Sequence, residues 1–172
     1  WDLIDVEAAD GIRMCDEGLV KKIDFDALAP APDGTSARED FGDTVVADCF
    51  IPEIVFSTTI GYRTDQLPEG AELPTGACDL FDLEKYPGRR ALNKRPIVNL
   101  EWALLCDGVP YEEVYSTLET DEGQARAFAK LDKLKANIQW WEAGAQPPQL
   151  LASGDLVMSA AYNGRISAAQ VE

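Results

Sequence analysis

Histidine is absent from this sequence of 172 residues. Its absence excludes Ser-His-Asp and Cys-His catalytic centres, His-ligated zinc and the usual general base near neutral pH. No apolar run approaches the roughly 20 residues that a membrane-spanning helix needs. Basic residues are scarce, with 15 Lys and Arg against 31 Asp and Glu, and the net charge of −16 disfavours binding to nucleic acid. We interpret the excess acid as solvated surface that keeps an exported protein soluble.

Cysteine is also infrequent, and its spacing is informative. The four residues Cys15, Cys49, Cys78 and Cys106 form no CxxC motif, which argues against a zinc ribbon or a thioredoxin-type centre. An even number in an exported protein indicates disulfides, with three possible connectivities. We favour Cys15–Cys49, because each lies beside a segment of the first region, and Cys78–Cys106 then follows by elimination. The alternative is four buried thiols in a reducing compartment.

The length favours one domain with a substantial core, since about 70% of the unfolded surface is buried at this size. The sequence shows no signal peptide and begins at Trp1, without Met, inside the apolar segment WDLIDV. We interpret this start as that of a processed, trimmed or cut piece of a longer protein.

Strand and helix patterns alternate along the chain. Period-two and apolar runs predict strands at 1–7, 49–62 (one long buried strand after Pro52), 89–92, 138–141 and 156–161. Three- and four-residue spacing and turn residues predict helices at 8–20, 79–86, 99–106, 111–118, 121–134, 146–152 and 165–170, with loops at 29–42 and 64–76. The alternation indicates an α/β sheet.

Ligands of α/β sheets bind beyond the carboxyl ends of the strands, where loops meet helix starts. Candidate sites therefore follow Ile60, Leu92, Trp141 and Ala161.

The richest of these places is the segment from Trp140 to Gln170. We expect Trp140 in the core and Trp141 stacked on a ligand, with core and rim of the sheet as the alternative for both. Glu142 is placed to pair with an ammonium group, or to favour the dipole of the following helix. The N–H groups of Gly144–Gln146 form either an anion site or an ordinary helix cap.

Basic and polar residues mark two further strand ends. Lys94 and Arg95 could bind a carboxylate or phosphate, with Arg95 acting in bidentate fashion. The alternative is a solvated turn. Tyr162 and Asn163 precede the last helix and are candidate ligand contacts, whereas Arg165 could equally be an ordinary residue of the helix face.

Several segments together resemble a known family. They are FIPEIVFSTTIGY, FDLEKYPGRRAL, LEWALLCDGV, AFAKLDKLKANIQWWEAGAQPPQLLASGDLVM and AYNGR, and in this order they resemble the periplasmic polyamine-type solute-binding proteins of ABC importers. The resemblance implies a type 2 periplasmic-binding-protein-like fold, with a mixed, mostly parallel sheet flanked by helices. It implies that residues 1–53 are part of the first lobe, 54–64 a hinge-crossing strand and 65–172 most of the second lobe.

The resemblance also implies a function without catalysis or a cofactor. The protein would capture a small polar solute, a polyamine or related amine, between two lobes in the periplasm and deliver it to a membrane permease. Phe56 and Ser57 match positions near the hinge and cleft, and Tyr162, followed by Asn163, matches a Trp that stacks on the ligand. The family's acidic residues that pair with polyamine ammonium groups are replaced here by Lys94–Pro96.

Two other functions are carried as alternatives. One is the effector-sensing domain of a transcription regulator with the same fold. The other is a carboxylate-based enzyme, for which the placed acids are Glu53, Glu101 and Glu142. The acids Asp24, Asp26 and Asp33 lack EF-hand spacing and are interpreted as solvated surface, not as a metal site. An incomplete lobe exposes strand edges, so we expect self-association of the fragment.

Overall fold

The computed structural model describes residues 2–171 and divides the chain into two units, Trp1–Val55 and Phe56–Glu172. The division falls inside the segment 54–64 that is predicted to cross the hinge. Assignment of the units to a first and a second lobe stays a prediction.

The first unit has little regular structure. It contains helix α1 (Ala8–Asp16), helix α2 (Ala37–Phe41) and two short 3-10 turns (Phe25–Ala27 and Gly42–Thr44). Its buried apolar side chains among the described residues are Phe25, Ala37 and Cys49, whereas Leu3, Ile4, Leu19 and Val46 are exposed. With so small a core, the Cys15–Cys49 disulfide adds a covalent link between α1 and the later part of the unit, where the Phe50 ring also lies against Gly11.

Three predictions for the first half of the chain are wrong. Residues 2–7 of the predicted strand 1–7 form no strand, and Trp1 lies outside the described residues. Of the predicted strand 49–62 only Thr58–Tyr62 is a strand, and Ile54 and Val55 are 73% and 86% exposed. A strand needs a neighbour for its N–H and C=O groups, and the described residues provide none here. The predicted loop 29–42 contains α2, whose first turn is capped by the Ser36 hydroxyl accepting from the Glu39 N–H.

The second unit is built on a four-stranded sheet. Its strands are β1 (Thr58–Tyr62), β2 (Arg90–Asn93), β3 (Ile138–Trp141) and β4 (Met158–Tyr162), in the spatial order β1-β4-β2-β3. Strand β2 runs parallel to both β3 and β4, whereas β1 runs antiparallel to β4. The carboxyl ends of β2, β3 and β4 therefore share one edge of the sheet with the start of β1.

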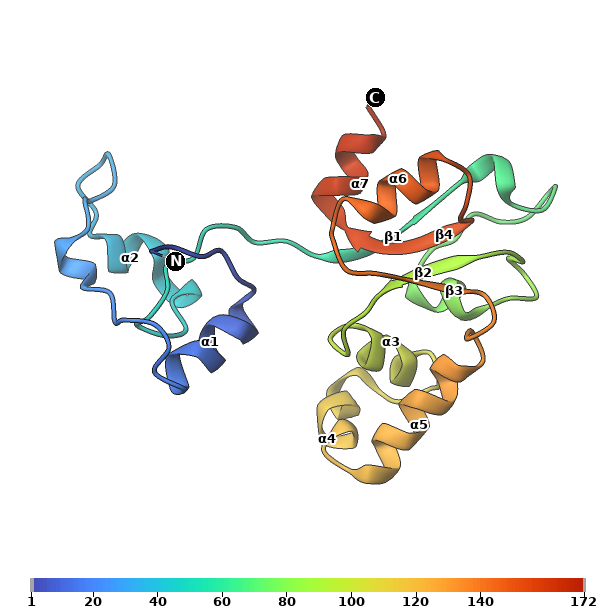
Figure 1. Cartoon of the computed structure of the whole chain (residues 1–172), viewed down its shortest axis with the longest axis horizontal. Helices are drawn as coiled ribbons and strands as arrows, with labels where there is room; N and C mark the ends of the chain where they lie inside the picture. The colour runs from blue at the N-terminus through green and yellow to red at the C-terminus, as the bar shows by residue number, and fades with distance from the viewer. Residues whose placement is uncertain (1, 172) are drawn as a thin grey trace. The chain divides into compact units, whose positions relative to one another are not determined.

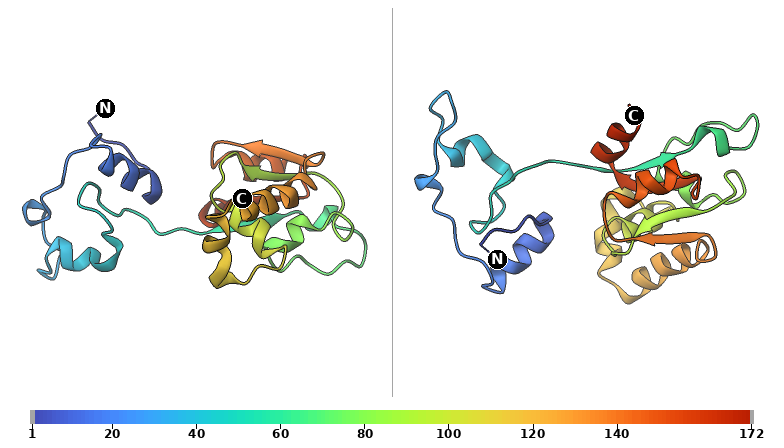
Figure 2. Two further views of the ribbon diagram at one scale, coloured as in Figure 1. Left: turned by 90° about the horizontal axis from the view of Figure 1, so that it is seen from below. Right: turned by 45° about the horizontal axis from the view of Figure 1, so that its top comes forward.

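Helices cover both faces of this sheet (Figures 1 and 2). One face packs against α3 (Asn99–Leu105) and α5 (Asp121–Asp132), and the other against α6 (Gln146–Ala152) and α7 (Asn163–Ala169). Helix α4 (Val114–Leu118) packs on α3 and α5 and lies away from the sheet. Leu92 belongs to the core that contains Leu80 and Leu134, whereas its neighbour Ala91 packs with Trp141 and Leu151. This alternation along β2 gives the predicted α/β architecture, and the predicted fold class is confirmed.

The paired tryptophans of β3 are distributed opposite to expectation. Trp141 points to the α6 face and is 1% exposed, whereas Trp140 points to the other face and is 47% exposed. The prediction that Trp140 lies in the core is wrong. Both residues lie on the edge strand β3, so the difference comes from the face of the sheet: Trp141 packs with Ala91, Leu151 and Leu156 in a buried core, and Trp140 points to the opposite face.

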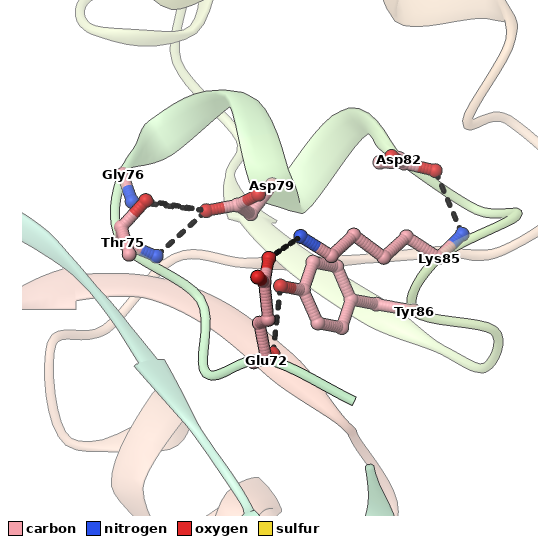
Figure 3. Close-up of polar contacts among 7 residues, drawn as sticks. All are labelled: Glu72, Thr75, Gly76, Asp79, Asp82, Lys85 and Tyr86. Atoms are coloured by element: carbon pink, nitrogen blue, oxygen red, sulfur yellow. Dashed lines mark hydrogen bonds and ion pairs between the residues drawn. The ribbon is translucent and has the colours of Figure 1, made fainter. Parts of the chain in front are cut away.

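The loop before β2 is held by its own polar groups (Figure 3). The Asp79 carboxylate accepts from the N–H groups of Thr75 (2.7 Å) and Gly76 (3.1 Å). Tyr86 is fully buried and its hydroxyl donates to the Glu72 carbonyl at 2.9 Å. The Lys85 ammonium is paired with the Glu72 carboxylate at 3.0 Å. These contacts fold the loop back on itself ahead of the sheet.

Arg90, the first residue of β2, is fully buried beneath this loop. Its guanidinium donates to the carbonyls of Leu80, Asp82, Tyr86 and Gly88. Five N–H donors in a planar fork suit such a set of acceptors. The buried charge thus fixes the path by which the chain enters β2.

Both favoured disulfides are confirmed, Cys15–Cys49 and Cys78–Cys106. The second joins the 3-10 helix Ala77–Phe81 to the end of α3. No helix within residues 2–171 has the length and apolar character needed to cross a membrane.

We expect Asp79→Asn to lower the free energy of unfolding by about 1 kcal/mol at neutral pH, because the charge-assisted hydrogen bonds to Thr75 and Gly76 are weakened in a partly solvated site. Burial opposes the charged form of Asp79, but these hydrogen bonds outweigh it and hold the pKa of the carboxyl below its ordinary value of 3.8. The contribution is therefore present above pH 3.8 and is lost as the pH falls through the lower, folded-state value.

Urea unfolding between pH 2 and pH 7 checks this expectation. In Asp79→Asn the free energy of unfolding should fall less steeply as the pH is lowered from 7 to 2. The control is Asp132→Asn at an exposed residue, which should leave this slope unchanged. An unchanged slope in Asp79→Asn would contradict the assignment.

We expect Cys78→Ser with Cys106→Ser to destabilise the second unit by about 2–4 kcal/mol, because the disulfide closes a loop with a sequence separation of 28 residues. Hydrogen exchange of the β4 amides measures the effect. Unchanged protection of these amides would show that the 3-10 helix is held without the covalent link.

Candidate functional site

The carboxyl-end edge of the sheet gathers most of the predicted site residues. Lys94 follows β2, Glu142 follows β3 and Asn163 follows β4, while Ser57 precedes β1. Since β2 is parallel to β3 and β4, these positions come from four separate segments and meet at one edge.

An ion pair joins the ends of β2 and β3. The Lys94 ammonium lies 2.8 Å from a Glu142 carboxylate oxygen, and the two side chains are 62% and 71% exposed. The Lys94 N–H also donates to the Trp141 carbonyl at 2.8 Å. The hydrogen bond to Glu142 raises the pKa of Lys94, and the same bond lowers the pKa of Glu142. The Lys94–Glu142 pair therefore presents one charge of each sign at neutral pH.

Two other basic residues were predicted for the site. Arg95 is half-buried in the segment between Lys94 and α3, and its main-chain carbonyl accepts from the Asn99 side chain. Arg165 is exposed on α7. A role for either in binding stays a prediction.

Three aromatic rings stand together at the end of β4. Tyr162 is half-buried, with its ring centroid 5.1 Å from that of Phe56 and 5.5 Å from that of Trp141, both in edge-to-face geometry. Phe56 is 44% exposed, but Trp141 is 1% exposed and offers no open ring face in this structure. Trp141 thus supports Tyr162 from the core, while Phe56 and Tyr162 form the accessible part of the group.

Ser57 and Asn163 bind each other across the start of β1 and the end of β4. The Ser57 N–H donates to the Asn163 side-chain oxygen at 3.1 Å, and the Asn163 N–H donates to the Ser57 carbonyl at 2.9 Å. Both residues were predicted as ligand contacts. The structure brings them together and uses them to extend the pairing of the two strands.

The turn between β3 and α6 supports the ion pair and the Tyr162 ring. A Cβ atom on Gly144 would lie 2.8 Å from two carbons of this ring, so the turn approaches it closely. The Gln146 side-chain oxygen accepts from the N–H groups of Glu142 and Ala143, both at 2.8 Å. These are not the N–H groups of Gly144–Gln146, so the choice between an anion site and a helix cap at those three residues stays a prediction. The side chain of Gln146 was not predicted, and its only sequence signal was its place before Pro147 at a helix start.

Two buried polar atoms lie directly before the ion pair in sequence. The Asn93 side-chain oxygen and the Trp141 indole nitrogen have no hydrogen-bond partner within residues 2–171. Asn93 and Trp141 are register partners on neighbouring strands. The last residues of β2 and β3 thus each carry a buried polar atom, directly before Lys94 and Glu142 in sequence. Nowhere in the described chain do three or more Asp, Glu, Cys or His side chains gather as a metal site.

Comparison with known proteins agrees with this architecture. All residues, 1–172, match the family model described as bacterial extracellular solute-binding protein. The chain belongs to this family. Its members are described as binding proteins, not as enzymes, which agrees with the prediction of a function without catalysis.

Three individual relatives have descriptions that name a solute. The chain is 49% identical over its 172 residues to a gamma-aminobutyric acid (GABA)-binding protein of Pseudomonas aeruginosa PAO1, covering 46% of that protein. It is similar to the periplasmic binding protein MotA of A. tumefaciens B6 in complex with glucopine, with 33% identity, a TM-score of 0.80 and coverage of 95% of this chain and 48% of that one. It is likewise similar to a solved GABA receptor, with 32% identity, a TM-score of 0.80 and coverage of 99% and 49%. The chain thus spans about half the length of these relatives.

We expect Gly144→Ala in this solute-binding chain to lower the free energy of unfolding by about 1–3 kcal/mol, because the added methyl group overlaps the Tyr162 ring. Gly164→Ala is the matched control, since a Cβ atom at Gly164 meets open space in α7 and should stabilise the helix by about 0.5–1 kcal/mol. Chemical denaturation followed by tyrosine and tryptophan fluorescence distinguishes the two. Equal effects at both positions would contradict the close approach.

Proposed function

We propose that this chain is part of the substrate-binding component of a bacterial ABC importer, and that its solute is a small amino acid with ammonium and carboxylate groups at opposite ends, such as GABA. This narrows the solute implied by the sequence resemblance, which was a polyamine or related amine. The observation that carries the proposal is the Lys94–Glu142 pair at the carboxyl-end edge of the sheet.

The charges of this pair favour a zwitterion over a polyamine. A polyamine carries only ammonium groups, and Lys94 and Arg95 would place positive charge beside them. Like charges brought together at a desolvated contact cost several kcal/mol. An amino acid provides a carboxylate for Lys94 and an ammonium group for Glu142, so each end of the solute finds an opposite charge.

The aromatic residues fit the part of such a solute that lies between its charges. GABA has three methylene groups between its ammonium and carboxylate groups. The partly exposed ring of Phe56 and its neighbour Tyr162 offer apolar surface against which methylene groups can pack. Each methylene group removed from water contributes about 0.8 kcal/mol.

The relatives support the same solute class and the same role. Proteins 49% and 32% identical to this chain are described as GABA-binding. We infer that the complete protein acts in the periplasm, closes about a hinge on its solute and delivers it to a membrane permease. Closure of this kind requires the solute to bind the closed form better than the open form.

A chimera tests the proposal, because the chain matches only 46% of the P. aeruginosa GABA-binding protein. Residues 1–172 replace the matching part of that protein, and calorimetry measures binding of GABA and of putrescine. We expect binding of GABA, weakened at least about tenfold by Lys94→Gln or Glu142→Gln through loss of a hydrogen bond to a charged group. Lys135→Gln is the matched control, because Lys135 forms an exposed ion pair with Asp132 on α5, and should change affinity less than about twofold.

Tighter binding of putrescine than of GABA by the folded chimera would overturn the solute class. Full GABA affinity in both Lys94→Gln and Glu142→Gln would overturn the site. If circular dichroism shows that the chimera is unfolded, the test is an NMR titration of the 172-residue chain with millimolar GABA. Amide chemical shifts of Lys94 and Glu142 that do not change on addition of GABA would refute the proposal.

A further inference from the structure

The segment that carries Lys94 is held by one buried side chain. Asn99, the first residue of α3, is 3% exposed. Its side-chain NH₂ donates to the Asn93 carbonyl at 2.6 Å and to the Arg95 carbonyl at 2.7 Å. These two carbonyls belong to the residues on either side of Lys94. One amide group therefore fixes the main chain on both sides of the lysine.

The same segment contains an unfavourable backbone conformation. Val98 has φ 72° and ψ −41°, although β-branched residues rarely adopt positive φ. A residue in such a region costs about 1–3 kcal/mol and persists only where the surroundings determine it. Asn99 follows directly and closes the segment through its two hydrogen bonds. The short connection from β2 to α3 is thus held in one shape at an energetic cost.

The segment that carries Glu142 is held in a matching way. Gln146, the first residue of α6, accepts from the N–H groups of Glu142 and Ala143 through one side-chain oxygen. Pro147 and Pro148 follow it, and their fixed φ angles stiffen the first turn of the helix. Here again one carboxamide at a helix start fixes the main chain at a charged residue.

The two carboxamides act on the two ends of one ion pair. Lys94 and Glu142 are exposed, and exposed ion pairs gain little because ordering two long side chains costs conformational entropy. With both main-chain positions fixed, and with the Lys94 N–H bound to the Trp141 carbonyl, only side-chain torsions remain to be ordered. The separation of the two charged groups is then limited by the reach of the two side chains from fixed main-chain positions.

We propose that Asn99 and Gln146 are positioning residues, which fix the spacing of Lys94 and Glu142 before the solute arrives and so determine the length of the amino acid that the pair accepts. The proposal rests on the proposed function, since it assigns the solute's two charged ends to this pair. Neither residue touches the solute in this account. Asn99 acts through the carbonyls of the two residues that flank Lys94, and Gln146 acts through the N–H groups of Glu142 and Ala143.

Asn99→Leu and Gln146→Leu test the proposal, because leucine removes the hydrogen bonds at similar side-chain volume. The matched control is Gln149→Leu, an exposed glutamine on the same helix α6. Calorimetry on the chimera described above measures affinity for β-alanine, GABA and 5-aminopentanoate, which differ by one methylene group at each step. NMR titration of the 172-residue variants measures the pKa of the Glu142 carboxyl.

We expect the unsubstituted chimera to prefer one length at least about tenfold, and either leucine variant to reduce that preference to within about threefold. In the same variants the pKa of Glu142 should rise toward its ordinary value of 4.5, because the Lys94 contact is occupied less often. Gln149→Leu should change neither quantity.

Each failure has its own signature. An unchanged length preference in both leucine variants, or an equal loss for all three solutes with the pKa of Glu142 unmoved, would overturn the positioning role while leaving the solute class intact. An unsubstituted chimera that binds none of the three amino acids would instead overturn the proposed function, and the positioning role with it. Variants that do not fold are replaced by Asn99→Ala and Gln146→Met, which are judged by the same two measurements.

Discussion

Parallel pairing of β2 with its two neighbours is the constraint on which the rest of this molecule depends. It brings the ends of three strands, far apart in sequence, to one edge of the sheet. The register Asn93↔Trp141 places the following residues, Lys94 and Glu142, opposite each other. A shift of one residue would send Trp141 to the opposite face and separate the charges. The site is therefore a consequence of strand register before it is a consequence of any side-chain contact.

The register is itself fixed by the loop that precedes β2 and by the packing on both faces of the sheet. Buried Arg90 holds the entry to β2 by donating to four carbonyls of the preceding loop. Ala91 and Leu92 then pack into separate cores on the two faces. A different register would leave the Arg90 guanidinium or its carbonyl partners without hydrogen bonds, or would expose apolar side chains of the two cores. This cost is what makes one strand register more stable than the others.

Sequence reasoning succeeded where local signals and tertiary packing agree. The strand Ile138–Trp141 and the helix Gln146–Ala152 were predicted with the bounds that the structure shows, because a β-rich run and a Pro-Pro helix start leave few alternatives. It failed at residues 49–57, which form no strand because no neighbouring strand pairs with them, and in which Ile54 and Val55 are exposed. An apolar pattern indicates that a segment can be buried, but it does not identify the strand or helix against which the segment would pack.

The candidate site shows the same division. Residue types and strand ends were sufficient to select Lys94, Glu142, Tyr162 and Asn163. The exposure of Trp140 and Trp141 was predicted the wrong way round, because it depends on which face of β3 the core with Leu151 and Leu156 covers. The roles of Asn99 and Gln146 were also missed. A side-chain amide that forms hydrogen bonds with the main chain of a nearby loop produces no recurring residue pattern in the sequence.

The paired hydrogen bonds between Ser57 and Asn163 have a mechanical consequence. They form the outermost rung of the β1–β4 ladder, next to the register pair Thr58↔Tyr162 and immediately after the exposed Val55–Phe56 segment. Tension applied to the chain ahead of β1 would therefore reach these two hydrogen bonds before the rest of the ladder. The segment that leads into β1 is thus joined by two bonds to the residue that directly follows Tyr162.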